Sequence, residues 1–276
     1  MGKKRLFSLI TDCRDQNATT RVAIAMAREL GASNIAPIGI VGVDNDLEAA
    51  LNLVDQLDAI RSAPGIILVN VAPRNGDAKR WQNGTPFGWL KVEDTFVFGT
   101  IGGLTFSLLQ KILGQKLVLN VFDLPRAVEC FELPRAEKEY IISTQFRSFE
   151  FLPRAAAAII KGIKLPTEEW SEVPEAPQAV VWIDNFTNVK TSVLPEEIGF
   201  RAGKKISLAV NGVTEVLTCY DRLKDVPDDT CGLVIDSSGL WVGGINRRFL
   251  GIVINGGRAA DHFKLKSGEN ITLNSH

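Results

Sequence analysis

Histidine is nearly absent from this chain of 276 residues, which contains only His262 and His276. Neither of them lies near a candidate nucleophile in the sequence, and His276 is the last residue. A Ser-His-Asp triad needs a histidine as its base, and many zinc sites use histidine ligands. We therefore expect neither such a triad nor a histidine-rich metal site, and we expect His262 on a surface helix.

Cysteine is also scarce, and its spacing carries no motif. The four cysteines, Cys13, Cys130, Cys219 and Cys231, include no CxxC pair. This spacing predicts neither a zinc site nor a disulfide framework. We expect four reduced thiols, most of them packed in the interior of a cytoplasmic protein.

The sequence lacks long apolar runs and blocks of like charge. No window approaches the roughly 18–20 apolar residues of a membrane helix, and the apolar run from Leu6 to Ile10 is too short for a secretion signal. Lys and Arg number 31 against 32 Asp and Glu, a net charge of -1. Such a balance gives no concentrated positive potential. We expect a small-molecule ligand, and neither nucleic acid nor membrane as a partner.

What the sequence does contain is the rhythm of an α/β domain. Through residue 163, short apolar runs alternate with amphipathic ones, which predicts a mostly parallel sheet covered by helices. The predicted strands are Leu6–Ile10, Ile35–Val41, Gly65–Val71, Thr95–Phe98 and Lys116–Asn120. The predicted helices are Arg21–Leu30, Asp46–Ile60 behind the possible caps Asp44 and Asn45, Leu104–Leu113, and Phe151–Ile163.

A change in composition separates this domain from a second one. Residues 164–178 are rich in proline and glutamate, which disfavours helix and strand alike and predicts a linker. Residues 179–276 then read as short strands between turns, which predicts a smaller antiparallel β-barrel. Its predicted strands are Ala179–Ile183, Lys205–Val210, Thr214–Thr218, Gly232–Ile235, Phe249–Ile254 and Asn270–Leu273.

Ligands of such chains usually bind where strands end or where domains meet, so the turns after strands are the candidate sites. Asp12 follows the first strand and could accept two hydrogen bonds from a ribose diol, although an Asx turn or a helix N-cap explains it equally well. Residues 71–80 form a loop rich in hydrogen-bond donors, which could bind a ligand. A charged loop exposed to solvent is the alternative. The glycine-rich turn 98–103 either approaches a ligand or only packs tightly.

A fourth turn, residues 184–193, follows the first strand of the second domain. Asp184 could hold an ammonium group, Phe186 could stack a purine, and Asn188 could read its edge. A polar β-turn with one buried phenylalanine is the alternative. No GxGxxG or GxxxxGK[ST] motif supports a phosphate site elsewhere in the chain.

These segments resemble the S-adenosylmethionine hydroxide adenosyltransferase and halogenase family, which includes the fluorinases and chlorinases. The resemblance is strongest in the second domain, where the family's Asp-x-Phe-Gly-Asn-x-x-Thr-Asn-Ile is similar to residues 184–193 (DNFTNVKTSV) and its Leu-Glu-Ile-Ala-Val-Asn-x-Gly-x-Ala-Ala to residues 250–260 (LGIVINGGRAA). In the first domain, Leu-Thr-Asp-Phe-Gly is similar to residues 10–14 (ITDCR), and Phe-His-Gly-Arg-Asp to residues 146–150 (FRSFE).

The resemblance implies a site for S-adenosylmethionine or adenosine between the two domains. Asp12 would bind the ribose diol, Asp184 the methionine ammonium, and Arg247, next to Asn246, the methionine carboxylate, which suits a guanidinium. The implied adenine pocket consists of Phe186, Asn188 and the backbone of Ile254 and Gly256. The resemblance also implies a homotrimer, and no cofactor beyond S-adenosylmethionine as ligand or substrate.

The residues that activate water in the family are only partly matched. Family hydrolases use an Asp, an Arg and a His, whereas the Asp position here is Ala72 and the His position is Arg147. The family's arginine has substitutes in Lys79 and Arg80. Loss of a general base typically costs about 10²–10⁴-fold in rate. We therefore expect weak or lost conversion of S-adenosylmethionine to adenosine and methionine, as in a pseudoenzyme.

Two alternatives stay open. Ser148 matches a serine of the fluorinating branch, and with Asn75 and Arg147 it could form an anion pocket for substitution at the ribose C5′ by a halide or another anion. Alternatively, the chain is a non-catalytic scaffold that has lost its ligand. Lys190, which replaces a residue that is aromatic in the halogenating branch, favours this second alternative because it would obstruct stacking.

Overall fold

The computed structural model describes residues 4–72 and 84–275, without the side chains of Pro37 and Ile38. The chain divides into two compact units. Unit 1 comprises residues 1–106 and 115–174, and unit 2 comprises residues 107–114 and 175–276. In the described ranges, no helix is both long enough and apolar enough to cross a membrane.

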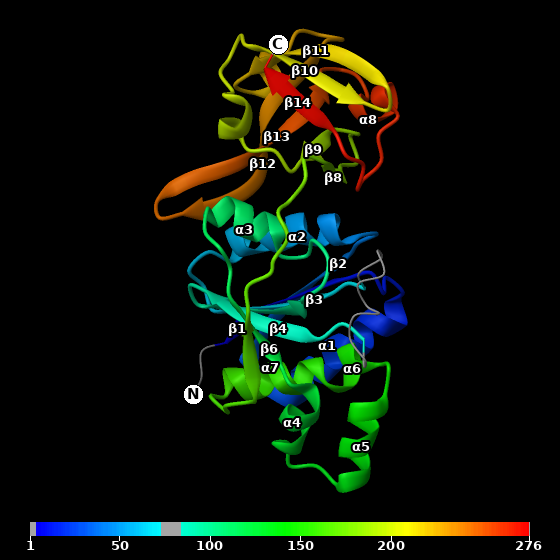
Figure 1. Ribbon diagram of the computed structural model, residues 1–276, viewed down its shortest axis with the longest axis vertical. Coiled ribbons are helices and arrows are strands. Elements are labelled where there is room, and N and C mark those ends of the chain that lie inside the picture. Colours follow the sequence, from blue (N-terminus) through cyan, green and yellow to red (C-terminus); the bar gives the residue numbers. More distant parts are fainter. Residues whose placement is uncertain (1–3, 73–83, 276) are drawn as a thin grey trace. The chain divides into compact units, whose positions relative to one another are not determined.

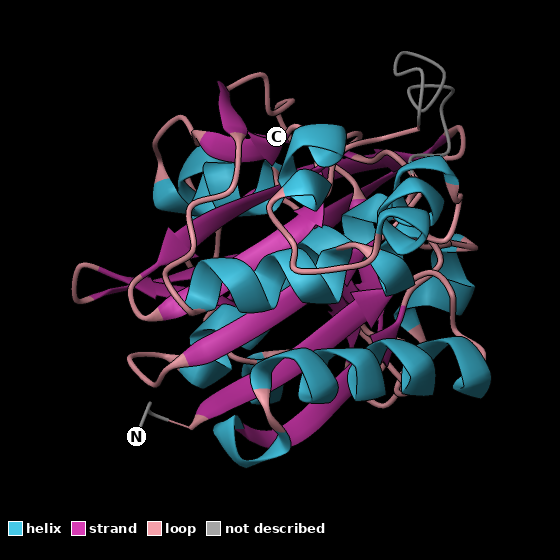
Figure 2. Cartoon of the chain, turned by 90° about the horizontal axis from the view of Figure 1, so that it is seen from below, coloured by secondary structure: helices cyan, strands magenta, loops and turns pink. Residues whose placement is uncertain are grey.

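The described part of unit 1 contains one mixed sheet of seven strands in the order β2-β1-β3-β5-β4-β6-β7 (Figure 2). The strands are β1 (Arg5–Thr11), β2 (Ile35–Gly42), β3 (Gly65–Asn70), β4 (Phe87–Val92), β5 (Thr95–Thr100), β6 (Leu119–Phe122) and β7 (Thr167–Trp170). β1 pairs in parallel with β2 and β3, and β3 with β5. The strands β5, β4, β6 and β7 pair with one another in antiparallel fashion. The prediction of a mostly parallel sheet is therefore wrong for this half of the sheet.

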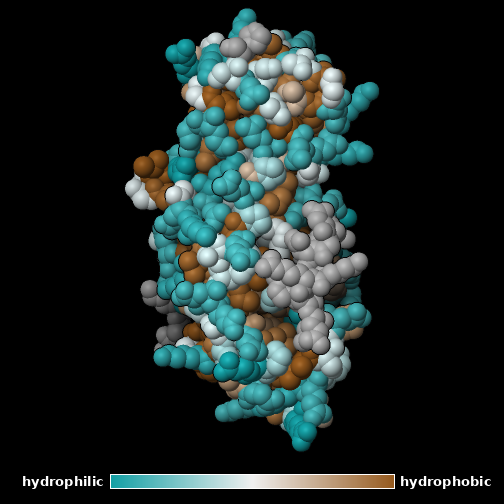
Figure 3. Space-filling model, in the orientation of Figure 1, coloured by the Kyte–Doolittle hydropathy of each residue, from teal (hydrophilic) through white to brown (hydrophobic). Residues whose placement is uncertain are grey.

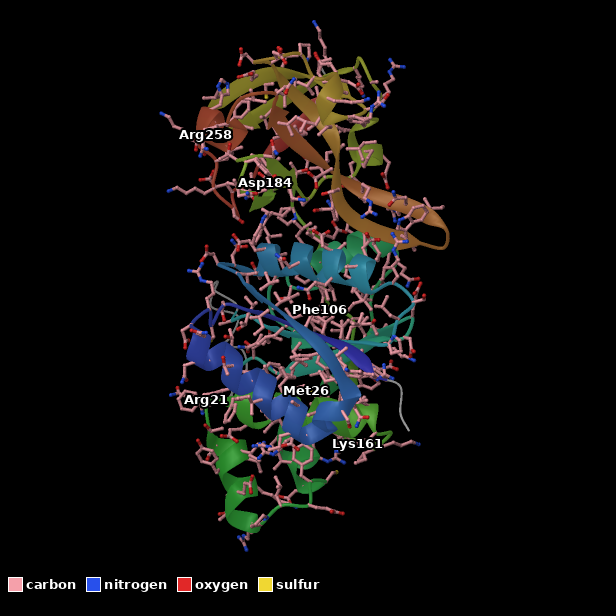
Figure 4. All side chains as sticks on the ribbon, turned by 180° about the vertical axis from the view of Figure 1, so that it is seen from behind. Arg21, Met26, Phe106, Lys161, Asp184 and Arg258 are labelled. Atoms are coloured by element: carbon pink, nitrogen blue, oxygen red, sulfur yellow. The ribbon has the colours of Figure 1, made fainter. Side chains whose placement is uncertain are left out.

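Helices cover both faces of this sheet, with α2 on one face and α1 and α7 on the other (Figure 1). Asp15 caps α1 by accepting a hydrogen bond from the Ala18 N–H at 2.8 Å, and Asn45 caps α2 in the same way. Met26 on α1 lies in the buried core beneath the sheet (Figure 4). The helices are α1 (Gln16–Leu30), α2 (Asp46–Ile60), α4 (Leu124–Glu129), α5 (Arg135–Ser143), α6 (Arg147–Glu150) and α7 (Leu152–Ile160), with a short 3-10 turn at Ala32–Asn34.

Unit 2 is built on a curled sheet in the order β14-β10-β11-β12-β13-β9-β8. Its strands are β8 (Val180–Ile183), β9 (Val189–Thr191), β10 (Lys205–Val210), β11 (Val213–Tyr220), β12 (Cys231–Val242), β13 (Ile245–Ile254) and β14 (Thr272–Ser275). Its helices are α3 (Ser107–Leu113), α8 (Ala259–Phe263) and the 3-10 turns Pro195–Ile198 and Leu223–Asp225. A bridge between Ala179 and Asn270 joins the two ends of the sheet.

The sheet of unit 2 is not antiparallel throughout, so the prediction of an antiparallel β-barrel is wrong for one pair of strands. β11 and β12 are parallel, because the connection over residues 221–230 carries the chain back before β12 begins. β12 and β13 then form a long hairpin, in which Trp241 lies opposite Asn246. The tip of this hairpin exposes Trp241 and Ile245, which gives it an apolar surface (Figure 3).

The predicted linker contains a strand. β7 pairs with β6, so that Trp170 lies opposite Leu119 and Thr167 opposite Phe122, and the two units divide after Pro174. The prediction that strand is disfavoured over 164–178 is therefore wrong. An edge strand pairs on one side only and accepts charged residues, here the exposed Glu168 and Glu169.

Candidate functional site

The turn after β8 is built around the carboxylate of Asp184. Oδ1 accepts hydrogen bonds from the backbone N–H groups of Phe186 and Asn188, both at 2.9 Å. Oδ2 accepts one from Nδ2 of Asn188 at 3.1 Å. The Thr187 N–H donates to the Asp184 carbonyl at 2.9 Å, and Thr187 has a φ of 65°. An Asx turn of this kind fixes the backbone between Asp184 and Asn188.

This turn directs the ring of Phe186 outward, where it is 69% exposed. The alternative of a buried phenylalanine in a polar turn is therefore wrong. The start of α8 lies beside the turn, because the Ala260 N–H donates to the Thr187 carbonyl at 3.0 Å. Asp184 and Arg258 are seen on these two neighbouring segments in Figure 4. An exposed aromatic face next to backbone turns is suited to stacking against a planar ligand.

A cavity of about 510 Å³ opens at this turn, and we call it the Phe186 cavity. Its lining includes Phe186, Asn188, Ile254 and Gly256, the four residues that the family resemblance assigns to an adenine pocket. The remaining lining residues are Asn185, Leu223, Asn255, Gly257 and Arg258. Asn188 and Ile254 lie in the same lining although 66 positions separate them in the sequence, and their role in binding adenine stays a prediction.

The far wall of the Phe186 cavity is the tight turn that ends β13. The Gly257 N–H donates to the Ile254 carbonyl at 3.1 Å, and Gly256 has a φ of 77°, a conformation that favours glycine. Asn255 anchors the turn, because its Nδ2 donates to the Val226 carbonyl and to Oδ1 of Asp228, both at 2.9 Å. Both walls of the cavity are thus fixed by local hydrogen bonds.

Arg247 lies elsewhere in unit 2, where it binds groups of the chain itself. Its Nη2 binds Oε1 of Glu196 at 2.5 Å, and its Nη1 donates to the carbonyl of Ile112 on α3. Burial raises the pKa of Glu196, but the hydrogen bond from Arg247 and the charges of Arg247 and Lys111 hold it below its ordinary value. Neither Arg247 nor the exposed Asn246 is among the described residues that line the Phe186 cavity.

Lys190 is also occupied away from the cavity. Its Nζ lies 2.8 Å from Oδ1 of Asp236 and 2.7 Å from Oγ of Ser238. The side chains of Lys190 and Asp236 are only 15% and 13% exposed. The ammonium group is therefore held in this ion pair, and the geometry does not place it over the ring of Phe186.

In unit 1, Asp12 follows β1, and its Oδ2 accepts a hydrogen bond from the Ala72 N–H at 3.1 Å. Asp15, and not Asp12, caps α1, so the N-cap alternative for Asp12 is wrong. The Ala72 methyl group offers no proton acceptor. Asn75, Lys79 and Arg80 lie outside the described residues.

Ser148 lines a separate cavity of about 290 Å³ in unit 1, together with Asp15, Arg21 and Asn70. The guanidinium of Arg21 lies over the ring of Phe149, with its Cζ 4.3 Å from the ring centroid. The carboxylate of Asp15 in the same lining opposes an anion at this place.

Arg147 does not join Ser148 in this cavity. Its Nη1 donates to the Gly84 carbonyl at 3.3 Å, and its guanidinium lies 6.0 Å from the ring of Phe87. Burial lowers the pKa of Arg147. Among the residues that the structure describes, Arg147 is not part of the lining around Ser148. The two side chains expected to share an anion pocket are thus directed to different surroundings.

The remaining candidates have structural roles. Gly99 packs closely, since a Cβ atom there would lie 3.1 Å from the ring of Phe106, which favours tight packing for the glycine-rich turn. His262 lies on α8 at the surface, as predicted, with its Nε2 3.1 Å from Oε2 of Glu215. All four cysteines are free thiols. The prediction that most are packed is wrong for Cys13 and Cys130, which are exposed.

Comparison with known proteins identifies the fold and leaves the ligand open. The sequence matches no protein-family model and no curated protein. The structure is similar to the crystal structure of an uncharacterized conserved protein from Thermotoga maritima, with a TM-score of 0.68 at 16% identity, covering 97% of this chain and 99% of that one. It is also similar to a conserved hypothetical protein from Thermus thermophilus, with a TM-score of 0.58 at 17% identity, covering 98% and 99%. The chain thus has an α/β fold that these proteins share over nearly their whole length.

Proposed function

We propose that this protein binds S-adenosylmethionine or adenosine through a purine site at the Phe186 cavity, and that it has little or no hydrolytic activity at the ribose C5′. One observation carries the proposal: Phe186, Asn188, Ile254 and Gly256 all line the same cavity. These are the positions assigned to adenine by the resemblance to S-adenosylmethionine hydroxide adenosyltransferases. Stacking of a base on an aromatic ring contributes about 1–3 kcal/mol.

The amide of Asn188 suits the edge of adenine. One N–H of its Nδ2 donates to Asp184, which leaves the second N–H and Oδ1 for a ligand. An asparagine amide can donate to a ring nitrogen of adenine and accept from its exocyclic amino group at the same time. The side chain therefore supports recognition of adenine in addition to stacking.

Weak hydrolysis follows from the residues at the water-activating positions. Ala72 has no group that can accept a proton, and Arg147 donates to the Gly84 carbonyl. A missing general base lowers a rate by about 10²–10⁴-fold. In the proposal, Lys79 or Arg80 replaces the arginine of the family, and Asp12 is the ribose ligand. We further propose a homotrimer, which the family resemblance implies, and a β-barrel for unit 2, which the spacing of its short strands predicts.

Titration calorimetry of the purified protein with S-adenosylmethionine and with adenosine tests the proposal. We expect saturable heat that returns to baseline, with no adenosine or methionine released in the S-adenosylmethionine sample. Continuing heat with release of both products would show an active hydrolase. Formation of a 5′-halo-adenosine when a halide is added would instead support attack of the halide at the ribose C5′, with Ser148 in the anion pocket. Absence of binding by both ligands would contradict the proposal and favour a scaffold without a ligand.

A further inference from the structure

The connection between β8 and β9 is a tight hairpin loop that contains one residue in the left-handed region. The Asp184 N–H donates to the Asn188 carbonyl at 3.1 Å, and the Thr187 N–H donates to the Asp184 carbonyl at 2.9 Å. Three-residue hairpin loops are commonly a type I turn followed by one left-handed residue. Here that residue is Thr187, with a φ of 65°. Glycine suits such a position because it has no Cβ atom.

Threonine is unfavourable at this position for two reasons. A β-branched side chain at positive φ crowds the backbone and is a rare outlier. The side chain of Thr187 also has little access to water, since the residue is only 8% exposed. Its Oγ1 is buried and has no hydrogen-bond partner among the described residues. A buried hydroxyl without a partner loses its hydrogen bonds to water. Thr187 therefore raises the free energy of the described turn.

Thr187 also links the two walls of the Phe186 cavity. Its neighbours Phe186 and Asn188 lie in one wall, and its carbonyl accepts the Ala260 N–H at 3.0 Å. Ala260 lies three residues after Gly257, which lines the far wall. A rotation of Thr187 out of the left-handed region would redirect this carbonyl and break the link. The residue that joins the walls is thus the strained one.

From these contacts we infer that the turn 184–188 exchanges between the described form and an open form in which Thr187 leaves the left-handed region, and that a purine ligand selects the described form. The open form loses the hydrogen bond to Ala260, but it relieves the backbone of Thr187 and returns its hydroxyl to water. These changes oppose each other, which keeps the two forms close in free energy. A ligand that contacts both walls binds the described form alone. The choice of ligand rests on the proposed function.

Hydrogen exchange of the Ala260 amide, followed by NMR in the ligand-free protein, tests the opening of the turn. Opening breaks the hydrogen bond to the Thr187 carbonyl, so the exchange rate reports the population of the open form. Thr187→Gly relieves the described form, and we expect the Ala260 amide to exchange at least fivefold more slowly than in the native protein. Asn211→Gly is the matched control, because Asn211 also has a positive φ, 50°, in a hairpin of unit 2 and lies outside the described lining.

Adenosine binding, measured by calorimetry, tests the link between the turn and the cavity. If only the described form binds, the dissociation constant falls as this form becomes more populated. We expect Thr187→Gly to bind adenosine at least threefold more tightly than the native protein does, and Asn211→Gly to bind it equally well. Thr187 is not among the described residues of the lining, so its substitution removes no contact to the ligand. Adenosine should also slow exchange of the Ala260 amide in the native protein.

Three results would overturn the inference. The first is an unchanged exchange rate of the Ala260 amide in Thr187→Gly, which would show that the turn has no open form relieved by glycine. The second is slower exchange with an unchanged affinity for adenosine, which would show that opening does not limit binding. The third is an equal slowing in Asn211→Gly, which would assign the effect to unit 2 as a whole. Failure of adenosine to bind any of the three proteins overturns the proposed function, and the exchange rates of the ligand-free proteins still decide whether the turn opens.

Discussion

Asp184 holds Asn188 from two sides. One carboxylate oxygen accepts the backbone N–H of Asn188 at 2.9 Å, and the other accepts its Nδ2 at 3.1 Å. An ionised carboxylate only accepts hydrogen bonds, so the nitrogen of the Asn188 amide must face Asp184. The amide proposed to read a purine edge therefore takes its orientation from a carboxylate that is not itself among the described lining residues.

Replacing Asn188 tests the purine edge directly. Asn188→Ala removes both hydrogen-bonding groups from the cavity, and we expect adenosine to bind more than tenfold more weakly, which corresponds to about 1.4 kcal/mol or more. Calorimetry measures the change, and Asn274→Ala, at an exposed asparagine on β14 outside the described lining, is the control. An unchanged affinity in Asn188→Ala would mean that adenine binds elsewhere.

The orientation of the Asn188 amide by Asp184 leads to a separate prediction about base preference. Asp184→Asn keeps an oxygen for the backbone of the turn but lets the Asn188 amide rotate, because the new amide can both donate and accept. The native protein should prefer adenosine over inosine, since Oδ1 can accept from the amino group that inosine lacks. In Asp184→Asn we expect this preference to fall at least threefold. Retention of the full preference would contradict the proposed role of Asp184.

The ion pair between Lys190 and Asp236 predicts a large effect on stability and none on binding. Lys190→Met leaves the carboxylate of Asp236 mostly buried and without its cation, and breaking a buried pair in this way costs about 3–5 kcal/mol. Urea denaturation measures the loss, and adding Asp236→Asn should restore more than half of it. A neutral effect of Lys190→Met alone would show that the pair contributes little.

Cys231 predicts a change of stability at high pH. Burial, with a contribution from the charge of Glu215, raises the pKa of its thiol to about 12. Between about pH 9 and pH 12 the unfolded state loses this proton while the folded state keeps it, so the free energy of unfolding falls as the pH rises. Cys231→Ala should flatten this fall relative to the native protein, and Cys130→Ala, at an exposed thiol, should not.

The raised pKa of the Cys231 thiol also slows its alkylation. At pH 8 we expect iodoacetamide to modify the exposed Cys130 in the native protein and to spare Cys231, because the thiolate is the reactive form. Peptide mass spectrometry reports the sites. Equal rates at both cysteines would contradict the burial of Cys231.

Much of the fold is predictable where local and tertiary signals agree. The sequence predicts the helix Asp46–Ile60 with its observed ends, because its apolar spacing and the Asn45 cap specify the same segment. It does not predict β7, because the local signals of residues 164–178, namely proline and glutamate, oppose a strand, while pairing with β6 stabilises one. The parallel pairing of β11 with β12 depends on the path of a ten-residue connection, which carries no periodic pattern.

The grouping of residues around the Phe186 cavity is suggested by the family resemblance and not by any local pattern of the sequence. No periodicity brings Asn188 and Ile254 to one cavity, and the family motifs supply that pairing independently of the structure, which places both in the same lining. The partners of charged side chains could not be predicted at all. Glu196 beside Arg247, Asp236 beside Lys190 and Gly84 beside Arg147 all lie far apart in the sequence, and folding alone brings them together.

A crystal structure of the protein grown with adenosine tests the central proposal most directly. We expect electron density for the purine ring stacked on Phe186, with its edge within hydrogen-bonding distance of Asn188 and the turn at Gly256. Density for adenosine at another place, with the Phe186 cavity empty, would contradict the proposed site.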